Sequence, residues 1–261
     1  MTKVVVITGA SGGIGAALAR RLARDHTQLV LAARRENELS EVASDTLAAG
    51  AHGAVTVRAD VTVRDDVLRI RDEALTQLGR IDVWVNNAGK GITRSVLDLT
   101  EGDVDEMIDV NVKSAIFGAQ AVVPHFIERG EGHLINISSF LGRVPIASFR
   151  SVYSASKAAL NSLTANLRMD LQQYPRIHVS LVMPGVVTTD FARNVRGEAR
   201  PPISAGLPGS SRMNPQTPEE VAEKIAELIA HPVAEIYTNP ASAEIAQRYY
   251  ANQGEQDVST R

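Results

Sequence analysis

An apolar run that passes directly into a glycine cluster, VVVITGASGGIG at residues 4–15, constrains this fold more than any other stretch of the chain. Its first four residues are β-branched and show no alternation of apolar and polar side chains. Such a run is typical of a parallel strand that is buried on both faces. Gly9, Gly13 and Gly15 then allow backbone conformations and close approaches that other residues disfavour. The stretch therefore predicts a strand, a tight turn and a helix that begins near Gly13.

The beginning of that helix is a predicted anion site, because its first N–H groups lack partners and the helix dipole is positive there. A dinucleotide pyrophosphate is the usual ligand of such a turn. A Walker A loop would need a lysine after its last glycine, but Ala16 follows Gly15 here, so a nucleoside triphosphate loop is disfavoured. A glycine-rich turn that binds nothing remains the alternative.

Composition excludes several other classes of protein. The chain has 261 residues, of which 44% are hydrophobic and 22% charged, which is the profile of a soluble protein with a large core. A net charge of −3 gives no basic field for nucleic acid. Without cysteine there are no disulfides, thiolate zinc sites or cysteine nucleophiles, and the six histidines have no metal-ligand spacing. No targeting or membrane-spanning segment is evident. We expect a cytoplasmic protein without metal, nucleic acid or membrane partners.

Strand and helix patterns alternate along the chain and predict an α/β fold with a doubly wound parallel sheet. A single domain is expected over 1–251, followed by a polar tail at 252–261. A helix that starts near Thr100 is expected to be kinked or interrupted at Pro124. The glycine- and proline-rich segment 190–217 is expected to be a substrate loop that is mobile until ligands bind. Strands are predicted near residues 3–8, 28–33, 54–59, 82–87, 132–138, 177–183 and 234–238.

Two polar motifs suggest acid/base chemistry. In YSASK, Tyr153 and Lys157 lie four residues apart on a predicted helix, so the ammonium can favour the phenolate and lower the pKa of the phenol. Ser139 ends a predicted strand 14 residues before Tyr153, where its hydroxyl could donate to a substrate oxygen. The alternative for Tyr153 and Lys157 is that both are ordinary exposed side chains on a helix. The alternative for Ser139 is that it caps the following turn. Asn86–Gly89 likewise end a strand, and Asn111 follows in a helix.

Taken in order, these motifs resemble the short-chain dehydrogenase/reductase family. TGASGGIG, NNAG, Asn111, the serine pair before YSASK, and PGVVTTD cover almost the whole chain, and the glycine spacing resembles the family's common shorter branch. The resemblance implies a single Rossmann domain of about seven strands in the order 3-2-1-4-5-6-7, assembled as a homodimer or homotetramer through long helices. It also implies an oxidoreductase that interconverts a small carbonyl compound and an alcohol by hydride transfer. A catalytically idle cofactor-sensing or scaffold protein is the alternative, and the intact Asn111, Ser139, Tyr153 and Lys157 argue against it.

The resemblance also assigns residue roles. Tyr153 would be the acid/base, Lys157 would lower its pKa and hold the nicotinamide ribose, Ser139 would position the reacting oxygen, and Asn111 would anchor a proton-relay water. Ser138 remains an alternative to Ser139, as Thr188 does to Thr189. The residues expected to bind the cofactor are Thr8, Gly9, Ser11, Gly13, Ile14, Gly15, Arg34, Arg35, Asp60, Val61, Asn87, Ala88, Gly89, Tyr153, Lys157, Pro184, Gly185, Val186 and Thr189.

The end of the second strand predicts which dinucleotide is bound. NAD sites place a carboxylate there for the ribose 2′-OH, whereas a 2′-phosphate requires an arginine. This chain has Ala33, Arg34 and Arg35 at that position and no carboxylate. The alternative is that both arginines are ordinary surface charges. The pattern favours NADP over NAD.

Overall fold

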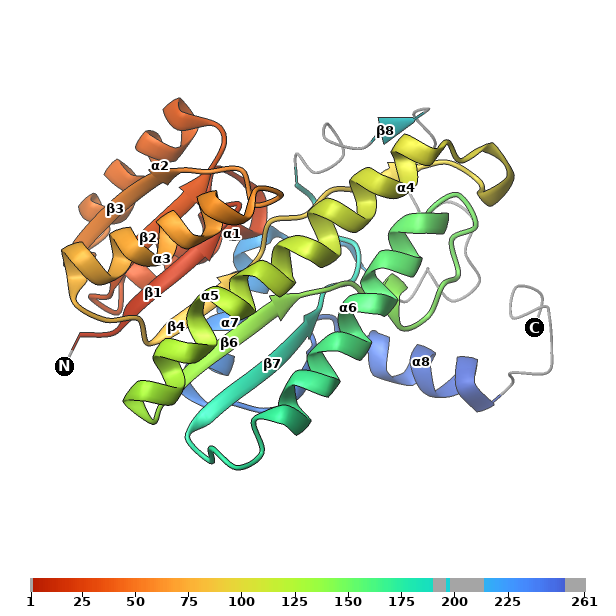
Figure 1. Cartoon of the computed structure of the whole chain (residues 1–261). Helices are drawn as coiled ribbons and strands as arrows, with labels where there is room; N and C mark the ends of the chain where they lie inside the picture. The colour runs from red at the N-terminus through yellow and green to blue at the C-terminus, as the bar shows by residue number, and fades with distance from the viewer. Residues whose placement is uncertain (1, 190–195, 198–213, 252–261) are drawn as a thin grey trace.

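Seven parallel strands form the central sheet of the computed structural model, which describes residues 2–189, 196–197 and 214–251 (Figure 1). Counted along the chain within this sheet, their spatial order is 3-2-1-4-5-6-7, as expected from the family resemblance. The reversal of order beside the first strand makes the sheet doubly wound. The strands are β1 (Val4–Thr8), β2 (Gln28–Ala33), β3 (Gly53–Arg58), β4 (Val83–Asn86), β6 (Gly132–Ile137), β7 (Ile177–Met183) and β9 (Glu235–Tyr237).

β1 lies in the middle of the sheet and is buried along its whole length. Val6 pairs with Val30 of β2 on one side and with Trp84 of β4 on the other. With neighbours on both edges and helices on both faces, every side chain of this strand meets protein, which explains the absence of polar alternation in its sequence.

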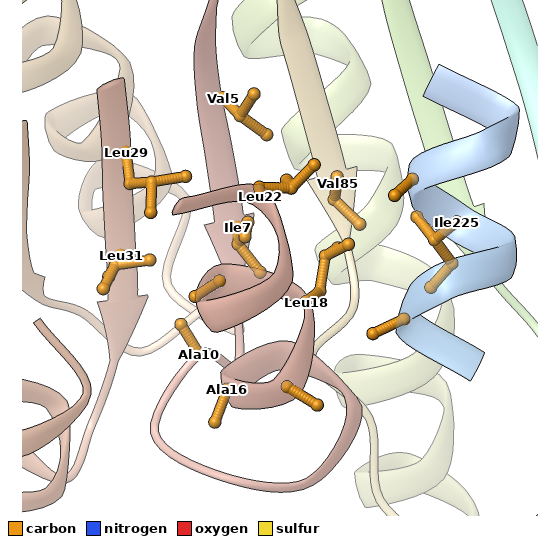
Figure 2. Close-up of a cluster of buried hydrophobic side chains, with 14 of the residues drawn as sticks. Val5, Ile7, Ala10, Ala16, Leu18, Leu22, Leu29, Leu31, Val85 and Ile225 are labelled. Atoms are coloured by element: carbon orange, nitrogen blue, oxygen red, sulfur yellow. The ribbon is translucent and has the colours of Figure 1, made fainter. Parts of the chain in front are cut away.

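Helices cover both faces of the sheet. α1 (Gly13–Ala23), α2 (Glu36–Ala48) and α7 (Pro218–Ala230) pack on one face, where Ile7, Leu18 and Ile225 share a cluster of buried side chains (Figure 2). α3 (Arg64–Leu78), α5 (Ser114–Arg129) and α6 (Ser151–Asp170) pack on the other face. This arrangement leaves the carboxyl edge of the sheet to the loops, which is where parallel sheets place their ligands.

One helical run crosses the molecule from Glu101 to Arg129 and contains a π-helical turn that the sequence did not predict. α4 (Glu101–Ile108) begins after a capping box at Thr100 and continues through a π-helical turn (Asp109–Lys113) into α5. Pro124 lies inside α5, and the helix extends beyond it to Arg129. Of the two expectations for Pro124, a kink or an interruption, the interruption is therefore wrong. Burial of Ala121, Val122 and Phe126 in the same helix offsets the hydrogen bond that a proline removes.

Two short strands stand apart from the main sheet. β5 (Ile92–Thr93) pairs in parallel with β8 (Arg196–Gly197) above the carboxyl edge. Most of the predicted substrate loop, residues 190–195 and 198–213, and the predicted tail lie outside the described residues. After this loop the chain forms α7 and β9, and its described part ends with α8 (Ala241–Ala251), which packs on Phe140 and Val144. No helix in the described part of the chain is both long and apolar enough to cross a bilayer.

Candidate active site

The glycine turn after β1 is locked to the NNAG segment after β4. The Thr8 hydroxyl donates to the carbonyl of Val85 and accepts from the backbone N–H groups of Asn87 and Ala88. In return, the Asn87 side chain donates to the carbonyls of Thr8 and Gly9. Gly9 has φ +67°, and a Cβ there would lie 2.8 Å from the Ala88 Cα. A glycine is thus required for both its conformation and this close approach.

The first turn of α1 has no internal group that neutralises its positive end. Gly12, at the N-cap position, provides no side-chain hydrogen bond, and the first turn contains no acidic residue. Gly13 has φ +53°, and its α-carbon faces Thr189, whose Cγ2 would lie 3.5 Å from an added Cβ. Arg35 donates to both the carbonyl and the hydroxyl of Ser11. Free N–H groups, small residues and a nearby cation fit a pyrophosphate at this turn.

Asn111 lies in the π-helical turn and is fully buried. Its Oδ1 accepts from the backbone N–H of Lys90 at 2.9 Å, and its Nδ2 donates to the Lys90 carbonyl and to the Ser156 hydroxyl. A Cβ on Gly89 would lie 3.3 Å from Asn111 Oδ1 and 3.5 Å from Lys157 Nζ. Asn111, Gly89 and Lys157 therefore meet at one point, although 68 positions of sequence from Gly89 to Lys157 separate them.

Ser138 and Ser139 follow β6 and point to different partners. Ser139 is hydrogen-bonded to Tyr153, and its hydroxyl accepts from the N–H of Leu141. Ser138 donates to Asn161 Oδ1 at 2.5 Å and to the carbonyl of Lys157 at 3.3 Å. Only Ser139 is thus directed at the phenol, which is the geometry expected of the residue that positions a reacting oxygen.

Tyr153 and Lys157 project from the first two turns of α6. Burial raises the pKa of the Tyr153 phenol, while the Ser139 hydrogen bond and the charge of Arg150 act in the opposite direction. The net change is upward, so the lowered phenol pKa expected from Lys157 is not what the structure shows. Lys157 Nζ lies 6.0 Å from the centroid of the Tyr153 ring and donates to the Ile137 carbonyl. Burial lowers the pKa of Lys157 to about 8.

The remaining predicted cofactor residues line the same edge of the sheet. Arg34 is exposed, with a guanidinium nitrogen 3.8 Å from an oxygen of Asp60. Burial pushes the pKa of Asp60 up, but hydrogen bonds from Thr62 and the charge of Arg34 outweigh this and lower it.

Of the two threonines in the PGVVTTD segment after β7, Thr188 donates to the carbonyl of Gln216, whereas Thr189 lies beside Gly13. In the same segment the Pro184 carbonyl accepts from the N–H of Phe140, and that of Val186 accepts from the N–H of Gln216. Ile14 lies in the first turn of α1, and Val61 and Gly185 lie in the segments that follow β3 and β7.

Sequence reasoning gave no site role to three residues that shape the site. Ser156 holds Asn111, and Arg150 lies close enough to Tyr153 for their charges to interact. Ser156 lies three residues after Tyr153 in α6, a spacing that places side chains on one helix face. Arg150 is the N-cap residue of the same helix, three positions before Tyr153. Gly142 brings the turn after Ser139 against α6, since a Cβ there would lie 2.7 Å from the backbone carbon of Lys157. In the part of the chain that the structure describes, no cluster of three or more His, Asp or Glu side chains could hold a metal.

Comparisons with a family model, with other sequences and with solved structures all find short chain dehydrogenases or oxidoreductases. The model of the short chain dehydrogenase family matches residues 3–200. The Bacillus subtilis protein named as uncharacterized oxidoreductase YxnA is 35% identical over 94% of this chain and 67% of its own length. A Burkholderia phymatum short chain dehydrogenase/reductase solved with NAD is 30% identical, with a TM-score of 0.86 over 100% of this chain and 97% of its own. An alcohol dehydrogenase from Thermococcus sibiricus solved with 5-hydroxy-NADP is 28% identical, with a TM-score of 0.79 over 93% and 98%.

Proposed function

The chain belongs to the short chain dehydrogenase family, and from that premise we propose that it is an NADP(H)-dependent oxidoreductase that interconverts a carbonyl compound and an alcohol. The observation that carries the proposal is the convergence of Ser139, Tyr153 and Lys157, with Lys157 beside Gly89 of the NNAG segment. A hydroxyl, a phenol and an ammonium brought together at the carboxyl edge of a parallel sheet form a proton-transfer site.

In carbonyl reduction, Tyr153 donates its proton to the substrate oxygen, so that no full alkoxide charge accumulates. Ser139 donates a hydrogen bond to the same oxygen and holds it in line with the phenol. Lys157 is charged at neutral pH, since its lowered pKa of about 8 is still above 7. Its cation, 6.0 Å from the phenol ring, favours the phenolate that remains once the proton has left.

The residues of the glycine turn fit a dinucleotide. The free N–H groups of α1 would hold its pyrophosphate, Asp60 and Val61 would border the adenine, and Asn87 to Gly89 and Thr189 would border the nicotinamide half. When bound, the nicotinamide supplies or accepts the hydride. Every other contribution comes from the chain, which orients the substrate and moves the proton.

The choice of NADP rests on the two arginines after β2. Arg34 is exposed beside Asp60, and Arg35 reaches the glycine turn through Ser11. Two cations at this strand end support the proposal that a 2′-phosphate on the adenosine ribose is bound there. The related structures contain both types of dinucleotide, NAD in one and 5-hydroxy-NADP in the other, so the preference rests on the arginines of this chain.

Substitutions at this strand end test the preference. Arg34→Ala should weaken NADPH binding by roughly 10- to 150-fold, because a charge-assisted hydrogen bond is worth about 1.5–3 kcal/mol, and should leave NADH nearly unaffected. Arg35→Ala measures how much the second arginine contributes to NADPH binding. Ala33→Asp should go further, by repelling the phosphate and accepting from a free 2′-OH. The measurement is kcat/KM with each cofactor, and a wild-type enzyme that prefers NADH would contradict the proposal.

A substrate screen tests the reaction itself. We expect the loss of NADPH absorbance when the protein is mixed with at least one member of a panel of ketones, aldehydes and ketoacyl thioesters. Each reaction should be repeated with Tyr153→Phe protein to remove background from contaminating enzymes. Absence of turnover across the panel, with NADPH binding intact, would favour a sensing role over catalysis.

We also propose a homodimer or homotetramer assembled through α5 and α6. These long helices lie on the same face of the sheet and expose apolar side chains, namely Ile127 on α5 and Leu163 and Met169 on α6. Sedimentation velocity measures the assembly directly. Leu163→Lys should shift it toward the monomer if this face forms the interface.

A further inference from the structure

Arg150 is a partly buried cation at the beginning of α6 that has no carboxylate partner among the described residues. Its Nη1 donates to the Ile92 carbonyl at 3.2 Å, and its guanidinium carbon lies 5.9 Å from the centroid of the Phe149 ring. Burial lowers the pKa of this guanidinium, so the structure disfavours its charge without a compensating carboxylate. A cation kept in such a place at a cost in stability is a candidate for a functional role.

The other charged groups around Tyr153 are paired or already assigned. Lys90, after β4, forms an ion pair with Glu106 of α4, and Arg94, after β5, forms one with Asp103 of α4 at 2.8 Å. On the side of β6, Arg143 forms an ion pair with Glu235.

That leaves Arg150, at the N-cap of α6, and Lys157, in the second turn of this helix. Lys157 is engaged with the Ile137 carbonyl. Within the part of the chain that the structure describes, Arg150 and Lys157 are therefore the cations near the phenol whose charge no carboxylate neutralises.

Local geometry holds the Arg150 guanidinium near the phenol. Arg150 is the N-cap residue of α6 and precedes Tyr153 by three residues, so both lie at the same end of that helix. Ile92, whose carbonyl binds the guanidinium, packs in the same buried cluster as Tyr153 and Met107. The hydrogen bond from Arg150 thus fixes its charge beside the apolar pocket that surrounds the phenol ring. In that pocket burial raises the pKa of Tyr153, and the charge of Arg150 lowers it.

We propose that Arg150 is a positioning residue that acts through Tyr153, because its cation stabilises the phenolate against the apolar pocket and so sets the pH range of proton transfer. The inference rests on the proposed acid/base role of Tyr153. In alcohol oxidation the hydroxyl proton passes to the phenolate oxygen, and the electrons of the adjacent C–H bond leave as hydride to the oxidised cofactor. Oxidation therefore needs the phenolate and reduction needs the phenol, so loss of Arg150 should affect the two directions oppositely.

A spectroscopic titration tests the inference without any substrate. The ultraviolet absorbance of tyrosinate is followed against pH for the full-length protein, and the curve of a matching variant that also carries Tyr153→Phe is subtracted. Arg150→Gln should raise the midpoint of the Tyr153 signal by about one pH unit, the low end of the effect of a nearby opposite charge. Arg150→Lys should restore most of the wild-type midpoint. Arg24→Gln, which removes an exposed charge distant from Tyr153, should leave it unchanged.

The pH profile of kcat/KM provides the second measurement, made with an uncharged alcohol and the corresponding ketone. In Arg150→Gln the rise of oxidation with pH should move upward, and reduction should persist to higher pH. An unchanged Tyr153 midpoint in Arg150→Gln would overturn the inference, as would a loss confined to KM for anionic substrates, which would make Arg150 a substrate-binding residue. Arg150→Met is a second neutral variant if the glutamine variant does not fold. If no substrate is turned over, the proposed function fails, while the titration still reports on Arg150.

Discussion

Ser138 and Ser139 are adjacent in the chain and chemically identical, yet the structure gives them different surroundings. Successive residues at the end of an extended strand point in opposite directions. Ser139 consequently meets Tyr153, while Ser138 is turned to Asn161 and the backbone of α6. The sequence left both serines open as the residue beside the substrate oxygen, because spacing alone does not show which side of the strand faces the helix.

The two serines form a matched pair of variants. Ser139→Ala should lower kcat by about 100-fold or more, the scale of losing one hydrogen-bond donor at a reacting oxygen. Ser138→Ala should retain most of its turnover but lose about 1–3 kcal/mol of unfolding free energy, because the half-buried side-chain oxygen of Asn161 loses the hydrogen bond that Ser138 donates. Steady-state kinetics and urea unfolding separate these effects. If Ser138→Ala proves to be the inactive variant, the assignment is reversed.

At the scale of elements, α5 packs closely on β4 because it has a glycine at the point of contact. A Cβ on Gly118 would lie 2.2 Å from Asn86 Oδ1, which accepts from the Trp84 indole at 2.7 Å. Asn86 also donates to Asn136 of β6, which in turn donates to Thr164 of α6. Asn86 also donates to the Ala115 carbonyl of α5, so this buried chain of hydrogen bonds joins two strands to two helices.

Gly118→Ala should therefore destabilise the protein by about 1–3 kcal/mol, the usual effect of forcing extra volume into a packed core, despite the better helix propensity of alanine. Gly102→Ala is the control, since an added Cβ in α4 would meet nothing within 4 Å. It should stabilise by about 0.4–1 kcal/mol. Urea midpoints measure both, and equal effects at the two glycines would contradict the packing described above.

The sequence predicted the sheet well because buried parallel strands have distinctive compositions. All seven predicted strands are present, with bounds within two residues. The glycine turn, the NNAG segment and the serine pair each directly follow a strand, and because parallel strands end at one edge, the sequence predicted a candidate site at that edge. The π-helical turn at Asn111 escaped prediction because one extra residue per turn hardly alters a helical pattern. The sequence did not single out Arg150, because the partial burial of its side chain and the lack of a neighbouring carboxylate depend on tertiary contacts.

At the scale of the whole molecule, acid should destabilise the fold through His133. This residue is buried at the start of β6, where Nε2 contacts the hydroxyl of Ser180 and Nδ1 has no hydrogen-bond partner among the described residues. Burial lowers the pKa of His133 to about 3, from 6.5 when unfolded, and the neighbouring His178 and Lys3 act in the same direction. Between these values the unfolded chain binds a proton that the folded protein does not. Unfolding free energy should thus fall as pH falls from 6.5 toward 3.

His133→Gln should flatten that dependence. One proton gives a slope of at most about 1.4 kcal/mol per pH unit, and the variant should lose the share of the acid slope that His133 contributes. His231→Gln, at an exposed helix end, serves as the control and should keep the wild-type slope. Urea unfolding of each protein at several pH values between 4 and 7 measures how its unfolding free energy depends on pH. Parallel pH curves for His133→Gln and wild type would exclude His133 as a source of acid sensitivity.

The central claim is that Tyr153 transfers the proton, and the turnover of Tyr153→Phe tests it most directly. This substitution removes only the phenolic oxygen, so cofactor affinity should change little while kcat falls by at least about 100-fold, the scale of general acid/base catalysis. Tyr250→Phe is the control. It removes the phenolic oxygen of a tyrosine in α8, which donates to the Arg143 carbonyl, and this variant should retain its activity. Near-wild-type turnover in Tyr153→Phe, with NADPH binding intact, would contradict the account.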